Sequence, residues 1–156
     1  MYESKLAAAI KVNGKVLREF NKDTVYIPFG SEYSILLKNL NTKRAIVETG
    51  GSIEWIGGNL GSGVTMLYPC SVLKWDDSRA MHFGIAFANA GQETDTGAKV
   101  IHIGKNTSSE IVSKSLSKNG GVSIYRGLVD IKKSALGAVS KIDCDGLILD
   151  SRSRSD

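Results

Sequence analysis

The chain is short of the residues that build cross-linked or metal-bound folds, with two cysteines, two histidines and two prolines among 156 residues. Cys70 and Cys144 lie far apart in the sequence, so we expect no structural disulfide and two thiols that are either buried or reactive. Neither His82 nor His102 stands at a metal-ligand spacing from the cysteines. We therefore expect hydrogen-bonded structural histidines in place of a zinc site.

Long apolar runs and strong charge of one sign are also missing. No apolar run is long enough to cross a bilayer, and the N-terminus lacks the layout of a secretory signal, so we expect a cytoplasmic protein without a membrane partner. The net charge is +4, and no basic block with interleaved aromatic residues occurs, which argues against a nucleic-acid partner. No Ser/His/Asp order or pair of carboxylates has a catalytic spacing, so we expect no enzyme.

The first part of the chain has the pattern of a β-hairpin. Asn13-Gly14 supplies the two positive φ angles of a two-residue turn, and apolar residues alternate on either side of it. We predict further strands over residues 24–27 and 33–37. These elements make a small all-β module at the N-terminus.

From Gly50 onward, short apolar stretches alternate with Gly, Ser, Thr and Asn, and no helical period appears. The stretches predict short strands whose connections are too brief for crossover helices. The glycine-rich segment 57–63 lacks the Gly-Lys-Ser/Thr ending of a phosphate-binding loop and reads as a turn. Two all-β architectures fit this pattern, an antiparallel sandwich and a parallel β-helix, and the hydroxylic residues beside branched apolar ones slightly favour the β-helix.

Several longer strings carry a resemblance to a known family. From about Thr42 to Asp156 the chain resembles, in order and spacing, the central part of SufB, the scaffold subunit of the SUF iron-sulfur cluster assembly system. The strings are ETGGSIEW, GVTMLYPCSVLK, DDSR, DTGAKVIHIGKNTSS, IVSKS, YRG and CDGLILD. The resemblance implies a right-handed parallel β-helix, a cytoplasmic location and the partners SufC and SufD.

Members of that family are several times longer than this chain. The resemblance therefore implies that the upstream β-helix, a downstream carboxylate and the helical domain that engages SufC are absent here. Residues 1–41 are instead similar to small phage structural proteins. We expect a chimera of two domains, a β module over 1–41 that is a possible cap and a β-helix fragment over 42–156.

Cys144 is the strongest candidate for chemistry. Strand alternation places Ser140, Ile142 and Cys144 on one face, which we expect to point inward, while Asp143 and Asp145 lie on the other. The resemblance implies that Cys144 accepts sulfur and holds the cluster, a role that requires thiolate. The flanking carboxylates oppose thiolate formation, and a buried structural thiol is the alternative.

The same resemblance bears on the roles of two other residues. Lys43 falls where the family has an interior lysine proposed to assist sulfur transfer, but a solvated strand-end lysine explains it equally well. Cys70 follows the proline that ends a strand, and we expect it to serve packing.

The sequence thus leaves two functional hypotheses. The first is a truncated scaffold core, inactive alone and without a cofactor as an isolated chain, from a family whose full-length members hold an iron-sulfur cluster. The second is a chimeric structural protein that self-associates through its open solenoid ends and has no chemistry of its own.

Overall fold

The structure is a computed structural model that describes residues 5–12, 15–16, 33–41 and 43–156, and all regular elements in these ranges are strands. None of the described residues forms a helix that is long and apolar enough to cross a membrane. The strands are β1 (Lys5–Val12), β2 (Lys15–Val16), β3 (Tyr33–Asn41), β4 (Arg44–Val47), β5 (Ser52–Asn59), β6 (Val64–Leu67), β7 (Cys70–Leu73), β8 (Arg79–Ala88), β9 (Glu93–His102), β10 (Ser108–Ser117), β11 (Val122–Ile131), β12 (Val139–Ile148) and β13 (Arg154–Ser155).

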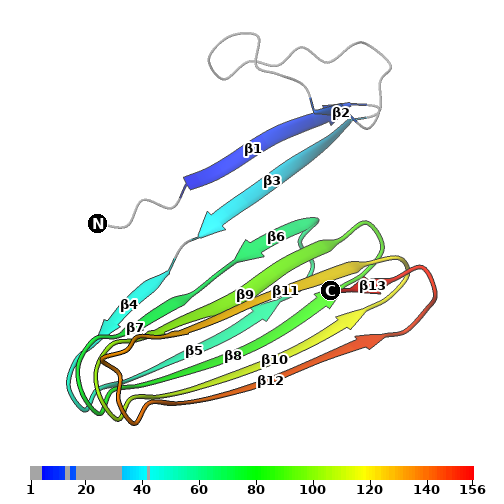
Figure 1. Cartoon of the computed structure of the whole chain (residues 1–156). Coiled ribbons are helices and arrows are strands. Elements are labelled where there is room, and N and C mark those ends of the chain that lie inside the picture. The colour runs from blue at the N-terminus through cyan, green and yellow to red at the C-terminus, as the bar shows by residue number, and fades with distance from the viewer. Residues whose placement is uncertain (1–4, 13–14, 17–32, 42) are drawn as a thin grey trace.

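From β4 onward the chain coils as a β-solenoid of about four turns, which confirms the predicted parallel β-helix and excludes the sandwich. One face is a sheet in the order β12-β10-β8-β5, and the other contains β13, β11, β9 and β6, with β7 between β4 and β9. Figure 1 shows these strands stacked turn upon turn, from cyan at the first turn to red at the last.

Neighbouring turns pair in strict register at a nearly constant sequence spacing. The hydroxyl of Thr94 donates to Ser123, 29 residues later, and that of Ser109 donates to Ser140, 31 residues later. One corner of the coil repeats as well, because Asp77 and Asn106 both adopt a positive φ, 58° and 51°. Aspartate and asparagine are the non-glycine residues that best tolerate this conformation, so the sequence supplies the corner that each turn needs.

The interior is narrow and filled by small or hydroxylic side chains around a few large ones. Leu73 and Val100 are 0% exposed and Ile111 is 1% exposed. On β8 the small residues Ala80 and Ala86 are buried, whereas Ile85 is 45% exposed. The alternation of β8 therefore places its small residues inside and its larger apolar residues outside.

The N-terminal hairpin is confirmed where the structure describes it. β1 pairs antiparallel with β2 across residues 13 and 14, and antiparallel with β3 along its whole length. The turn at Asn13-Gly14 and the predicted strand over 24–27 lie outside the described residues. β3 then joins the solenoid by a short parallel pairing of Leu40 and Asn41 with β6.

The hairpin extends one sheet at the first turn and does not spread over the other face (Figure 1). Within the described residues, β5 pairs only with β8 and β4 only with β7. The segment predicted as a turn over 57–63 also differs, because Gly57 and Gly58 continue β5. Extended backbone is compatible with glycine when the pairing partner fixes the register, which β8 does here.

Candidate functional site

Cys144 belongs to an inward-facing column that crosses all four strands of one sheet. The register aligns Gly57, Gly84, Ser113 and Cys144 on successive turns, and Ser113 is 7% exposed. The expected inward orientation of this row is therefore confirmed. The thiol is nevertheless exposed, because β12 is the last strand of its sheet within the described residues and no further turn covers it.

The surroundings of Cys144 hold its thiol in the protonated form at neutral pH. Partial burial of the sulfur raises the pKa of Cys144, and the charges of Asp143 and Asp145 raise it further. Tyr125 and Lys114 act in the opposite direction. The Nζ of Lys114 forms ion pairs with both carboxylates, at 3.0 Å from Asp143 and in closer contact with Asp145. These carboxylates partly neutralise the ammonium charge, so Lys114 lowers the pKa of Cys144 less than an unpaired lysine would.

Tyr125 lies across the lumen from Cys144 and interacts with its thiol. Burial is the main cause that raises the pKa of the Tyr125 phenol, and the neighbouring Cys144 adds to the effect. The hydroxyl is buried and has no hydrogen-bond partner of normal geometry within the described residues. It is therefore a donor free to bond a thiolate or a guest in the lumen.

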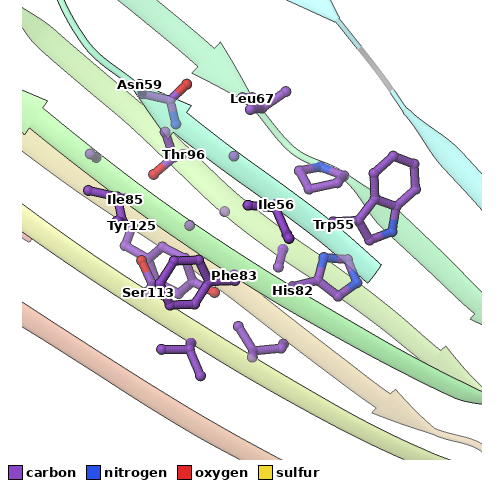
Figure 2. A pocket seen from close by; sticks show the side chains of 18 of the residues that line it. Trp55, Ile56, Asn59, Leu67, His82, Phe83, Ile85, Thr96, Ser113 and Tyr125 are labelled. Carbon is purple, nitrogen blue, oxygen red and sulfur yellow. The ribbon is translucent and has the colours of Figure 1, made fainter. Parts of the chain in front are cut away.

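A cavity of about 100 Å³ lies inside the solenoid and is lined by residues from β5 to β11. Figure 2 shows Tyr125 and Ser113 together on one side of it, with Trp55 and His82 on another. The space exists because Gly57 and Gly84 carry no side chain there, and a Cβ added to Gly84 would meet no atom within 4 Å. Lys43 lies at its rim.

A buried hydrogen-bonded chain supports one wall of this cavity. The indole Nε1 of Trp55 donates to the Oγ of Ser71 at 2.9 Å, and the same oxygen lies 2.9 Å from Nε2 of His82. Nδ1 of His82 is buried without a partner within the described residues. The expectation of a fully hydrogen-bonded histidine is therefore wrong for His82, because the glycine column beside it offers no polar group.

The second histidine is fully hydrogen-bonded, as predicted. Nδ1 of His102 lies 2.7 Å from the hydroxyl of Thr107, and Nε2 lies 2.9 Å from that of Ser109. Ser109 in turn donates to Ser140 on the last strand. Burial lowers the pKa of His102, so the ring is neutral, and its two hydrogen bonds connect β9 to Thr107 and Ser109 within the same turn.

The remaining candidates do not join Cys144 in one site. Cys70 is 8% exposed, in agreement with the packing role expected for it. The side chain of Lys43 is exposed, and its carbonyl accepts a hydrogen bond from the backbone N–H of Cys70. Lys43 precedes β4 in the first turn, whereas Cys144 lies on β12 in the last. Among the described residues no group of three or more His, Cys, Asp and Glu side chains is placed to hold a metal ion.

Sequence reasoning missed Tyr125 and the pairing of Ser71 with His82. The spacing between turns points to Tyr125, which it aligns with Thr96, whereas Ser71 and His82 are 11 residues apart on strands of different sheets. A search for that period predicts which polar residues share the lumen.

The comparisons with known proteins agree with this geometry. The profile of the family described as SUF system FeS cluster assembly, SufBD core domain, matches residues 34–156, beginning within β3. The chain is 52% identical over 118 residues to the iron-sulfur cluster assembly protein SufB of Bacillus subtilis (strain 168), over 76% of this chain and 25% of that protein. It is 55% identical to an iron-sulfur cluster assembly SufBD family protein of Staphylococcus epidermidis, with the same coverage of both chains.

A SufBD family protein of Mycobacterium leprae is 52% identical over the same share of this chain and 14% of its own length. The chain thus spans a quarter or less of the length of these relatives.

Proposed function

Because this chain belongs to the SufBD core family of the SUF iron-sulfur cluster assembly system, we propose that it is a scaffold segment in which Cys144 accepts sulfur for a nascent cluster. The observation that carries the proposal is the position of this thiol, in the inward-facing column and yet accessible at the last turn. A soft sulfur ligand is what iron-sulfur chemistry requires. The segment acts as a platform and not as an enzyme.

The raised pKa of Cys144 is consistent with a thiol that must be deprotonated by another group before it reacts. A protonated thiol is a poor nucleophile and a poor metal ligand. A partner that covers the last turn and brings a base or a cation near the sulfur would favour the thiolate. Isolated, the chain presents one ligand of this kind, and we infer that it is inactive in cluster assembly alone.

Anaerobic reconstitution with iron and sulfide tests the scaffold role. We expect only weak iron-sulfur absorption from the wild-type chain. One thiolate fills a single coordination position of the cluster iron, and the other positions need ligands that Cys144 does not supply. The absorption should disappear in Cys144→Ser and persist in Cys70→Ser, whose sulfur is buried. Absorption of equal strength in Cys144→Ser would contradict the proposal.

Partners and location follow from the same family membership. We infer that the protein works in the cytoplasm beside SufC and SufD. The separate, phage-like origin of residues 1–41 stays a prediction.

A second candidate, self-association without chemistry, is favoured by the open last turn. β12 pairs only with β10 within the described residues, and its apolar side chains remain accessible, with Val139 66%, Ile142 52% and Leu147 55% exposed. An unpaired strand edge with apolar side chains is a template for another chain. On this view a second copy covers β12.

Sedimentation over a concentration series separates the two candidates. Self-association predicts a weight-average mass that rises with concentration and that Leu147→Lys suppresses, since a charged residue on an edge strand opposes pairing. Ile85→Lys is the control, because Ile85 is similarly exposed on the inner strand β8. A strict monomer at high concentration would rule the second candidate out.

A further inference from the structure

The cavity that extends from β5 to β11 is lined by two polar groups without a hydrogen-bond partner of normal geometry in the described structure. The described residues contain two buried side-chain polar atoms without a partner, Nδ1 of His82 and the hydroxyl of Tyr125, and both residues line this cavity. An unsatisfied buried polar group costs about 1–3 kcal/mol. That both fall on one cavity indicates that something within it accepts their hydrogen bonds.

The hydrogen-bond partners of His82 indicate which tautomer faces the cavity. The indole of Trp55 can only donate, so Ser71 either accepts from Trp55 and donates to Nε2 of His82, or accepts from both rings. We assign the first arrangement, because in the second the hydroxyl hydrogen of Ser71 has no acceptor among the described residues. The proton of the neutral ring then lies on Nδ1, which is a donor. Burial lowers the pKa of His82 to about 4, so the ring carries no charge at neutral pH.

The charge of the cavity lining selects the sign of the guest. None of the described residues that line it is Asp or Glu, and Lys43 at the rim supplies a positive charge. The walls are otherwise largely apolar, including Trp55, Leu67 and Ala98. Neutral donors in an apolar lining suit a weakly hydrated anion, because the free energy of desolvation is too large for a strongly hydrated ion.

We propose that this cavity binds one small, weakly hydrated monovalent anion between Nδ1–H of His82 and O–H of Tyr125. The volume of about 100 Å³ accommodates an ion of the size of iodide or thiocyanate, since a water molecule occupies about 30 Å³ in the liquid. The site shares Tyr125 with the surroundings of Cys144, but anion binding does not depend on cluster chemistry.

Iodide quenching of tryptophan fluorescence tests the site directly. The chain has two tryptophans, and Trp75→Phe removes the one outside the cavity and leaves Trp55 in its wall. We expect quenching of Trp55 with a saturable part at low iodide, above a linear collisional part, at constant ionic strength maintained with strongly hydrated sulfate.

The deciding variant is Tyr125→Phe in the same background, which removes only the hydroxyl and leaves the ring in place. We expect iodide to bind about tenfold more weakly, the loss typical of a hydrogen bond to a charged group. Tyr68→Phe is the matched control, because Tyr68 lies near Asp95 and Arg126 and does not line the cavity.

Three results would overturn the proposal. Purely linear quenching would mean that the donors hold only water. A saturable part of equal strength in Tyr125→Phe would place the ion elsewhere, and an equal loss in Tyr68→Phe would show that the effect is not specific to the cavity.

Discussion

Replacement of Ile111 by alanine should lower the free energy of unfolding by about 3 kcal/mol, within the range known for large-to-small changes in packed cores. Ile111 is 1% exposed and belongs to the central cluster with Leu73 and Val100. Both neighbouring turns hold it, so the lining cannot collapse into the space that the substitution leaves. Urea denaturation followed by circular dichroism measures the change.

The same substitution one turn later provides the control. Ile142 pairs with Ile111 in register on β12 but is 52% exposed, since no described strand lies beyond it. Ile142→Ala should therefore cost about 1 kcal/mol or less. Equal losses at both positions would contradict the parallel register, which alone makes one isoleucine internal and the other terminal.

Much of the fold could be predicted from residue pattern and family resemblance together. Short apolar stretches with Gly and Asn stops predicted strands, and Asn13-Gly14 predicted the hairpin whose flanking strands are observed. Pattern alone did not decide between sandwich and solenoid, because strand alternation is the same in both. The direction of pairing depends on contacts about one turn apart, such as that between Thr94 and Ser123, and only the turn spacing encodes these.

The candidate site was predictable only in part. Alternation correctly placed Cys144 in the inward row, since the side-chain period of a strand is two. Its exposure was not predictable from the strand itself, because that depends on whether another turn follows β12. The unpartnered Nδ1 of His82 also escaped prediction, since it depends on Gly57, which the register places beside Gly84 one turn away.

Complete loss of sulfur acceptance is the largest functional effect expected from one substitution. When a persulfide donor is added anaerobically, the thiolate of Cys144 attacks the outer sulfur, the sulfur–sulfur bond of the donor breaks, and the donor leaves as its thiolate. The protein then gains one sulfur atom. Because the pKa of Cys144 is raised, the thiolate fraction and the rate of transfer should increase as the pH rises above neutrality.

Intact mass spectrometry of that reaction tests the central claim, that Cys144 is the sulfur acceptor of this segment. We predict an added mass of one sulfur atom on the wild-type chain and on Cys70→Ser, and none on Cys144→Ser. The same added mass on Cys144→Ser, or its loss in Cys70→Ser alone, would contradict the account.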